Sequence, residues 1–265
     1  MNKKNIVLIP ARSGSQRIKN KNFKICGGKP LIYWTLNAAK KSKKVDQIYV
    51  STDSKKISNY CQKEGALIPY LRPPRLSNSK TLMIDVIKHF YSFILKNNIQ
   101  CNSLTLLQPT SPLRKSEDID NCLKIYNKLK PNSVVSVCKL NQTVKLNTIM
   151  CKKNNFIFVK NFLSDSEIKK KSGKNELLYR NGPAVVVLNP VNLSKNSLFG
   201  KKISYYEMPI ERSVDIDVDY DFRIADLLLS NWKNLLLKIY IYYLISEAFW
   251  YLFYNLRLSN HKQWD

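Results

Sequence analysis

Short apolar runs alternate with longer amphipathic segments along the first half of the chain, and this alternation limits the possible folds more than any other feature of the sequence. The runs are four or five residues long, which suits a strand and is too short for a helix. Each is followed by a segment of helical length, as in parallel strands joined by crossover helices. The expected strands are 6–9, 47–51, 67–70, 103–107 and 134–137, and the expected helices are 31–41, 54–64, 81–97 and 116–129.

The pattern changes between residues 139 and 182. Lysine, asparagine and serine are dense here, and the two β-like runs at 144–150 and 156–159 are followed by no long helical period. We therefore expect an inserted hairpin or loop region rather than a second domain. The alternation resumes with strands at 184–188 and 203–206 and a helix at 220–230, so residues 1–230 are expected to form one α/β domain.

A polar, basic loop follows the first expected strand. Its sequence, ARSGSQRIKNKN (11–22), supplies backbone N–H groups and several cations within one turn, which suits a polyphosphate. Gly14 can adopt backbone angles that aim successive amides at one anion, and Arg12 and Lys21 stand at either end as charge partners. The loop is neither a Walker A motif nor a dinucleotide-binding GxGxxG motif. A basic loop that is merely solvated is the alternative.

Two aspartates flank a single isoleucine near the end of the expected domain, in the segment SVDID (213–217). On a strand, the carboxylates of Asp215 and Asp217 would point to one face. Two such carboxylates repel each other unless a proton or a cation bridges them, and Mg²⁺ binds carboxylate oxygens. The spacing therefore predicts a site for a hard divalent cation such as Mg²⁺. Helix capping is the competing explanation, and it fits Asp219 and Asp221 better.

Two further expected strands end in residues suited to ligand contact. Thr52 and Asp53 follow the second strand, at the edge where open α/β sheets bind ligands, although an N-cap of the next helix is the favoured role for Asp53. The segment RPPRL (72–76) follows the third strand. Its two prolines limit the freedom of the loop, which helps to aim Arg72 inward.

The segment LLQPTSPLR (106–114) joins the fourth strand to the next helix. Gln108 leaves the strand, two prolines fix the turn, and the hydroxyls of Thr110 and Ser111 can meet a polar ligand. A purely structural turn is the alternative interpretation.

Taken together, these segments resemble the acylneuraminate cytidylyltransferase family, which makes CMP-activated nine-carbon sugar acids. The resemblance covers residues 5 to about 230, with the motifs in the family's order. It implies a Rossmann-like nucleotidyltransferase fold of the α/β class, with three α/β/α layers, a mostly parallel sheet and a small dimerisation arm at 139–182. It also implies a homodimer that transfers CMP from CTP to a nonulosonic (sialic-type) acid and releases pyrophosphate, for surface polysaccharide or glycoprotein glycosylation. A CMP-Kdo or phosphonate cytidylyltransferase of the same fold is the first alternative, and a non-catalytic membrane or nucleic-acid adaptor is the second.

The resemblance also implies roles for individual residues, including Asn22, whose match to a KN pair of the family points to reading of cytosine. The segment RNGPA (180–184) resembles the family's NGA segment, whose Asn and Gly line the sugar site, but Pro183 is an extra residue. The sequence also departs from the family at 78–81, where an acidic residue is missing and Lys80 is added. No side chain stands out as a general base, and the lysine that meets the sugar carboxylate is left open within 169–174. The expected roles are catalysis for Arg12, Lys21 and Gln108; CTP and substrate contact for Ser13, Gly14, Ser15, Asn22 and Arg72; sugar-acid contact for Gln108, Thr110, Ser111, Asn181 and Gly182; and Mg²⁺ binding for Asp215 and Asp217.

The formal net charge of +25 raises nucleic acid or an anionic membrane surface as partners. However, the lysines are spread along the chain among many asparagines and isoleucines, a mix typical of an AT-rich genome, so no nucleic-acid partner is expected. Six cysteines form no CxxC pair and no cluster with the two histidines, which indicates neither a zinc site nor a disulfide framework. The first apolar run is too short for a signal peptide, and we expect a cytoplasmic enzyme.

Residues 231–265 form an apolar, aromatic C-terminal extension. Its segment 235–256 has 22 residues, enough to span a bilayer as a helix. Lys238 and Glu247 would fall on opposite faces of that helix, so it has no clean polar face for lying on a membrane surface. Membrane anchoring or contact, packing on a partner subunit or on the domain itself, and a disordered extension are the three interpretations.

Overall fold

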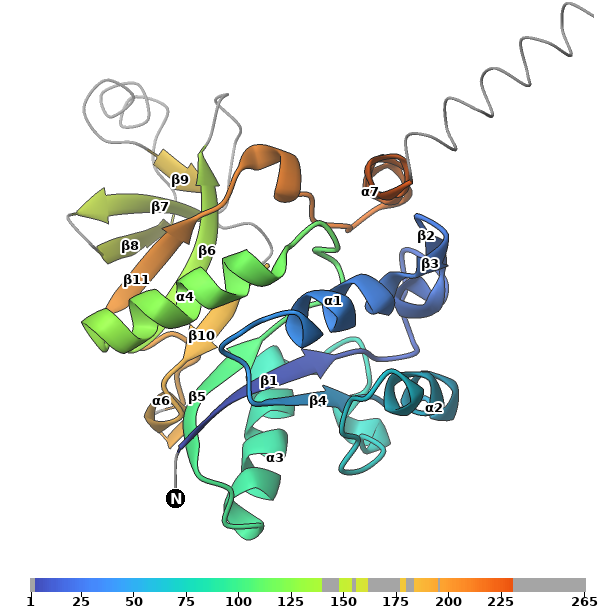
Figure 1. Cartoon of the computed structure of the whole chain (residues 1–265), viewed down its shortest axis with the longest axis horizontal. Helices are drawn as coiled ribbons and strands as arrows, with labels where there is room; N and C mark the ends of the chain where they lie inside the picture. Colours follow the sequence, from blue (N-terminus) through green and yellow to red (C-terminus); the bar gives the residue numbers. More distant parts are fainter. Residues whose placement is uncertain are drawn as a thin grey trace, which may run out of the picture.

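A mostly parallel sheet forms the centre of the computed structural model, which describes residues 3–139, 148–153, 156–161, 177–179, 184–194 and 196–230 (Figure 1). Its strands are β1 (Lys4–Pro10), β4 (Gln47–Ser51), β5 (Cys101–Leu106), β6 (Ser133–Lys139), β10 (Val186–Leu188) and β11 (Ile203–Glu207). They lie in the order β4-β1-β5-β10-β6-β11. β1 is parallel to both of its neighbours and β11 is parallel to β6, whereas β10 is antiparallel to β5 and β6.

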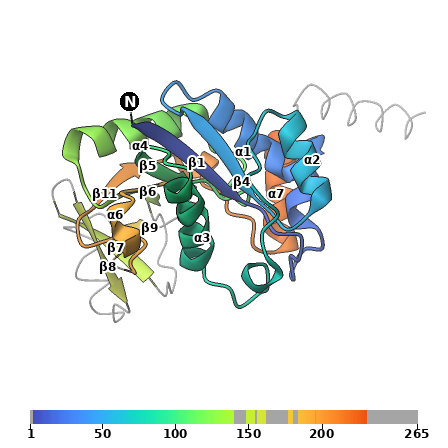
Figure 2. The same cartoon turned by 90° about the horizontal axis from the view of Figure 1, so that it is seen from below.

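Helices cover both faces of this sheet. On one face lie α1 (Leu31–Lys40), α2 (Lys55–Lys63) and α4 (Ser116–Leu129), and on the other lie α3 (Met83–Lys96) and the short α6 (Val191–Ser194). The side chains of β1 alternate between the two cores: Val7 and Ile9 pack on the α1 and α4 side, and Ile6 and Leu8 pack on the α3 side. Figure 2 shows these two groups of helices on opposite sides of β1. The predicted three-layer α/β/α fold is confirmed.

The prediction of a strand at 67–70 is wrong. Only two isolated bridges join this stretch to β4, Tyr49 with Leu67 and Thr52 with Leu71. Hydrogen bonds form at its two ends, from the N–H of Leu67 to the carbonyl of Ile48 at 2.8 Å and from the N–H of Arg72 to the carbonyl of Thr52 at 2.7 Å. Pro69 stands between them and has no N–H to donate, so the ladder is interrupted.

A two-stranded hairpin that the sequence analysis did not anticipate precedes α1. It consists of β2 (Ile25–Cys26) and β3 (Lys29–Pro30), joined by Gly27 and Gly28, which have φ of 59° and 78°. Two consecutive residues with positive φ are typical of a tight hairpin turn. The last described helix, α7 (Asp219–Leu229), packs beside this hairpin, and the N–H of Gly27 donates to Asp226 Oδ1 at 2.6 Å.

Antiparallel strands represent the inserted region, as expected. β7 (Thr148–Lys153) pairs with β8 (Phe156–Asn161), and β9 (Leu177–Tyr179) pairs with both β7 and β6 (Figure 1). The expected run at 144–150 is only partly within the described residues, and a dimerisation role for this arm stays a prediction. No helix in the described part of the chain is long and apolar enough to cross a membrane, and the segment 235–256 lies outside that part.

Candidate active site

A cavity of about 500 Å³ opens at the carboxyl ends of β1 and β5. This is the edge of an open α/β sheet where ligands bind, and the volume is typical of a site for a small molecule. Four cationic side chains line it, and two carboxylates stand among them. The charged and polar residues around it include Arg12, Ser15, Arg17, Lys21, Asn22, Arg72, Gln108, Thr110, Asp215 and Asp217.

The basic loop is held to the sheet by Asp53. The backbone N–H of Ser13 donates to Asp53 Oδ1 at 2.8 Å, and the Ser13 hydroxyl donates to Asp53 Oδ2 at 2.6 Å. The favoured N-cap role for Asp53 is therefore wrong. Ser54 caps α2 instead, because its hydroxyl accepts a hydrogen bond from the N–H of Ile57 at 3.3 Å.

Within the loop, the predicted residues play different structural parts. Asn22 is 7% exposed and donates from Nδ2 to the carbonyl of Arg12 at 2.9 Å, which ties the two ends of the loop together. Ser15 uses its N–H within the loop, donating to the carbonyl of Ser13 at 3.0 Å. Gly14 has no left-handed φ, and a Cβ at this position would meet no atom within 4 Å. The structure therefore shows no need for glycine's backbone freedom there, contrary to the expectation.

Arg72 is buried at the cavity wall, and part of its guanidinium has no partner among the described residues. Its side chain is 5% exposed, and its Nε and Nη2 have no hydrogen-bond partner in the described part of the chain. Burial lowers the pKa of the guanidinium, Asp53 opposes that effect and Arg12 adds to it. A short 3-10 turn, η2 (Pro74–Leu76), follows and keeps the segment bent. A buried guanidinium with open donors favours an anionic or carbonyl-bearing ligand.

The loop between β5 and α4 is fixed by Arg114, to which the sequence analysis gave no separate role. Arg114 is 3% exposed, and burial lowers its pKa to about 10. It donates to the carbonyl of Ala184 at 2.6 Å, to the hydroxyl of Thr35 at 2.7 Å and to the carbonyl of Gln108 at 3.1 Å. These bonds hold Gln108 at the wall of the cavity.

Thr110 and Ser111 differ in position although they are adjacent. Thr110 lines the cavity, and its hydroxyl acts to lower the pKa of Asp215. Ser111 is fully buried, its hydroxyl has no partner among the described residues, and it is not part of the cavity lining there. The turn therefore presents one of the two predicted hydroxyls to a ligand and buries the other.

Asp215 and Asp217 both line the cavity, but the segment that carries them is irregular, so the predicted strand is wrong. Asp215 is half-buried, and its Oδ1 is closed off from solvent with no hydrogen-bond partner among the described residues. Desolvation raises the pKa of Asp215 to about 6, Asp217 adds to the rise, and Thr110 and Lys21 oppose it. Asp217 is exposed and forms an ion pair with Arg17.

Backbone contacts replace the missing strand ladder. The N–H of Ile216 donates to the carbonyl of Thr110 at 2.8 Å, and the ammonium of Lys21 donates to the carbonyl of Ile216 at 2.6 Å. Burial lowers the pKa of Lys21, and Asp217 and Asp215 oppose that effect. Asp221 Oδ2 accepts from the N–H of the N-cap residue Val218 at 2.9 Å, so Asp221 caps the start of α7, as expected, and it also accepts from the N–H of Asp217 at 2.8 Å.

The sequence matches the model of a family described as cytidylyltransferases over residues 6–248. The chain belongs to this family. The match extends beyond residue 230, where the resemblance seen in the sequence ended, and so includes part of the C-terminal extension.

Two curated proteins that are similar to this cytidylyltransferase are named as a cytidylyltransferase and as a CMP-sugar-acid synthase. An N-acylneuraminate cytidylyltransferase of Streptococcus agalactiae serotype III is 32% identical over 221 residues, which cover 83% of this chain and 52% of that protein. A CMP-N,N'-diacetyllegionaminic acid synthase of Legionella pneumophila is 30% identical over 226 residues, 85% of this chain and 96% of that protein. The chain thus spans about half the length of the streptococcal relative and nearly all of the Legionella one.

A solved structure extends the likeness to the fold. It is a CMP:2-keto-3-deoxy-manno-octonic acid synthetase complexed with CTP, with a TM-score of 0.66 and 16% identity, and the match covers 85% of this chain and 98% of that one. At this identity the likeness concerns the fold alone. It confirms the expected Rossmann-like nucleotidyltransferase architecture for this member of the family.

The carboxylate pair fits a hard cation that needs few protein ligands. No group of three or more His, Cys, Asp or Glu side chains that could hold a metal is present among the described residues. Mg²⁺ is commonly held by one or two carboxylates together with water and substrate phosphates. The unpartnered Oδ1 of Asp215 at the cavity wall fits that requirement.

Some predicted residues lie outside the described part of the chain, and some important ones were missed. Asn181, Gly182 and the lysines within 169–174 belong to the first group. Arg17 and Arg114 belong to the second, although both stand inside quoted motifs. No local signal marks the role of Arg114, because its partners Ala184 and Thr35 lie 70 and 79 positions away in the sequence.

Proposed function

We propose that this protein transfers CMP from CTP to a nonulosonic (sialic-type) acid, forming a CMP-sugar and pyrophosphate. The observation that carries the proposal is the cavity itself, in which four cations and two carboxylates stand at the carboxyl edge of the sheet. A nucleoside triphosphate carries several negative charges, which the cations can neutralise. The names of the two curated relatives support a sugar acid of the sialic or legionaminic type as the acceptor.

The reaction joins an acceptor oxygen to the α-phosphorus of CTP. A hydroxyl oxygen of the sugar acid attacks that phosphorus, and the bond from the phosphorus to the oxygen bridging to the β-phosphate breaks. Pyrophosphate leaves with the electron pair, and the hydroxyl proton passes to solvent. The protein's contribution to such a transfer is chiefly positioning and neutralisation of charge.

The basic loop and Arg72 would hold the nucleotide. Arg12, Ser15 and Lys21 face the cavity and would bind the triphosphate, with Ser13 and Gly14 shaping the loop behind them. Asn22 lines the same cavity and would contact cytosine. Arg72 offers two buried donors without partners to an acceptor group of the nucleotide or of the acid.

Asp215 and Asp217 would hold Mg²⁺, which when bound supplies positive charge beside the phosphates and lowers the pKa of a nearby hydroxyl. Thr110 and the Lys21 contact to Ile216 orient the carboxylate segment toward the cavity. Arg17 forms an ion pair with Asp217 in the described structure. Both residues line the cavity, so the Arg17 guanidinium would exchange Asp217 for a phosphate of the bound nucleotide.

The acceptor would lie on the Gln108 side of the cavity, with Thr110 lining the same wall. Ser111 would act from beneath the turn, and Asn181 and Gly182 are further proposed acceptor contacts. We also propose a homodimer in which the arm at 139–182 reaches the neighbouring subunit.

Pyrophosphate release tests the proposal. The full-length protein is incubated with Mg²⁺ and CTP, or ATP, GTP or UTP, against sialic, legionaminic, pseudaminic and Kdo acids and 2-aminoethylphosphonate. The expected result is turnover with CTP and one nonulosonic acid, lost in Asp217→Ala. Turnover with Kdo or the phosphonate alone would show that the acceptor is not a nonulosonic acid. A folded protein that binds no CTP would favour the non-catalytic adaptor.

A further inference from the structure

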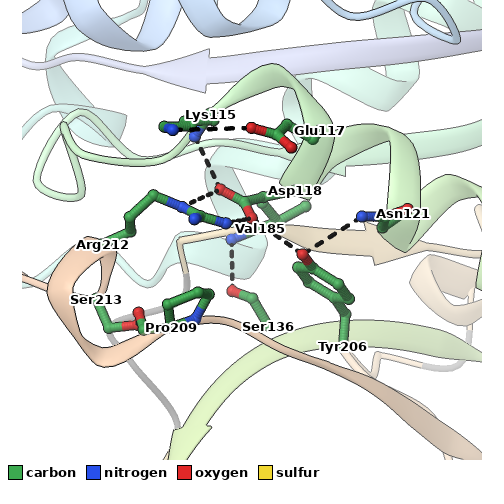
Figure 3. A network of polar contacts seen from close by, with 10 residues as sticks. All are labelled: Lys115, Glu117, Asp118, Asn121, Ser136, Val185, Tyr206, Pro209, Arg212 and Ser213. Atoms are coloured by element: carbon green, nitrogen blue, oxygen red, sulfur yellow. Dashed lines mark hydrogen bonds and ion pairs between the residues drawn. The ribbon is translucent and has the colours of Figure 1, made fainter.

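Asp118 has more partners than a helix cap needs. It lies in the first turn of α4 and is fully buried. Its Oδ2 accepts from the N–H of Lys115 at 2.8 Å, which caps the helix. Its Oδ1 accepts from Nη2 of Arg212 at 2.6 Å and from the Tyr206 hydroxyl at 3.2 Å (Figure 3). The contacts at Oδ1 join α4 to a segment 94 positions away in the sequence.

Arg212 stands directly before the segment that carries the carboxylates. It ends the 3-10 turn η3 (Ile210–Arg212), and the turn is closed by a hydrogen bond from the Ser213 hydroxyl to the carbonyl of Pro209 at 2.8 Å. Figure 3 shows this turn facing Asp118 at the start of α4. Only two residues separate Arg212 from Asp215, so a shift of the turn would move the Asp215 carboxylate.

The start of α4 also anchors the loop on the other side of the cavity. Arg114 precedes the helix and holds the carbonyl of Gln108, and the carbonyl of Thr110 accepts from the N–H of Ile216 at 2.8 Å. The loop and the carboxylate segment therefore meet at Thr110 and are both fastened to the same end of α4. The ion pair of Asp118 with Arg212 is a further link between the start of α4 and the carboxylate segment.

We propose that Asp118 and Arg212 are positioning residues for the metal-binding carboxylates. Neither is among the described residues that line the cavity, so both act through the segment that follows Arg212. Asp118 is fully buried, and removing Arg212 would leave a buried carboxylate without its cationic partner. The inference rests on the proposed function, because it presumes that Asp215 and Asp217 hold Mg²⁺.

The test is the Mg²⁺ dependence of pyrophosphate release, measured at saturating CTP for Arg212→Ala, Arg212→Lys and Tyr206→Phe. We expect Arg212→Ala to raise the half-saturating Mg²⁺ concentration about tenfold or more, as for the loss of groups that orient metal ligands. Arg212→Lys should restore part of the loss, and CTP binding in EDTA should change by less than about twofold.

Two control variants separate positioning from stability. Arg223→Ala removes the exposed pair with Asp219 in α7, and Ile94→Val trims a fully buried core side chain far along α3. Both should keep the wild-type Mg²⁺ dependence, although Ile94→Val lowers the melting temperature.

A lower melting temperature for Arg212→Ala with an unchanged Mg²⁺ requirement would overturn the inference. If Arg212→Ala does not fold, wild-type Mg²⁺ dependence in both Arg212→Lys and Tyr206→Phe would overturn it equally. Wild-type protein without Mg²⁺-dependent turnover would instead refute the proposed function, and the inference with it.

Discussion

Two charged side chains of the cavity, the buried Arg72 and the half-buried Asp215, lack full compensation. Arg72 has two donors with no partner among the described residues, and Asp215 has one such acceptor. Buried polar groups in proteins are nearly always hydrogen-bonded, so unpaired ones at a cavity wall indicate a ligand that completes them. Both residues should therefore lower the stability of the ligand-free protein.

For Asp215 the effect depends on pH. The pKa of its carboxyl is about 6 in the fold and 3.8 in the unfolded reference, so the fold is destabilised by ionisation above pH 6 and unaffected below pH 3.8. We expect Asp215→Asn to abolish turnover and, in EDTA at pH 7.5, to stabilise the protein by about 1–3 kcal/mol. The gain should shrink as the pH falls from 6 to 4. Urea unfolding at several pH values measures it, and a gain that is constant with pH would contradict this explanation.

Arg72 gives a second prediction. Arg72→Met removes the unpaired donors and keeps most of the buried volume, so the free energy of unfolding of the ligand-free protein should rise, by up to about 1 kcal/mol. Affinity for CTP should fall about 10- to 100-fold, because hydrogen bonds to charged groups contribute about 1.5–3 kcal/mol. Arg75→Met, at an exposed position in the same segment, is the matched control. Equal CTP affinities for the two variants by calorimetry would show that Arg72 does not meet the nucleotide.

The hairpin of β2 and β3 sets the position of α7, and α7 in turn holds the carboxylate segment through Asp221. A Cβ at Gly27 would lie 2.4 Å from Leu229 Cβ, whereas a Cβ at Gly28 would meet nothing within 4 Å. Both glycines have positive φ. Alanine substitutions at the two glycines therefore separate the cost of backbone strain from the cost of steric contact with α7.

We expect Gly28→Ala to lower the free energy of unfolding by about 1 kcal/mol, which is the strain of an alanine at positive φ. Gly27→Ala should cost about 1–3 kcal/mol more, because α7 must move away from the hairpin. Chemical denaturation of both variants measures the difference. Equal losses would mean that α7 does not pack on Gly27 as described.

The elements that the sequence predicted well are those with a regular apolar period. The helices at 31–41 and 116–129 match α1 and α4 within one residue, because buried side chains such as Leu36 and Leu123 recur at helical spacing. The prediction of a strand at 67–70 is wrong because Pro69, which has no N–H to donate, interrupts the ladder although the residues around it are apolar.

For the site, the sequence predicted many of the residues but not the contacts that hold them in place. Motifs placed Arg12, Lys21, Gln108 and Asp215 at one cavity, because each follows a strand or precedes a helix in a known order. The links from Asp53 to Ser13 and from Asp118 to Arg212 join residues far apart in sequence, and no local pattern encodes which distant partner a carboxylate finds. Such contacts become visible only in the folded structure.

Across the whole domain, loops that are distant in sequence meet at one edge of the sheet. The cavity combines residues from the loop after β1, from the segment between α2 and α3, from the loop after β5, and from the stretch before α7. Its four cations outnumber its two carboxylates, so the cavity favours an anionic ligand. This local excess is only a small part of the net charge of +25.

Nucleotide binding should therefore stabilise the domain selectively. With CTP and Mg²⁺ at about 100 times the dissociation constant, the gain is about 2.7 kcal/mol, which raises the melting temperature of a domain of this size by roughly 5–10 °C. ATP and GTP at the same concentration should give a much smaller shift. Equal shifts for all nucleotides would indicate charge binding without recognition of cytosine.

The most direct test is to identify the product that carries the α-phosphate. The wild-type protein is incubated with α-labelled CTP, Mg²⁺ and a sialic or legionaminic acid, and the products are separated and weighed by mass spectrometry. We expect the label in a CMP-sugar, one pyrophosphate for each CMP-sugar formed, and no product with Asp217→Ala. Label recovered only as CTP or free CMP, across all acids tested and with folded protein, would contradict the proposed transfer.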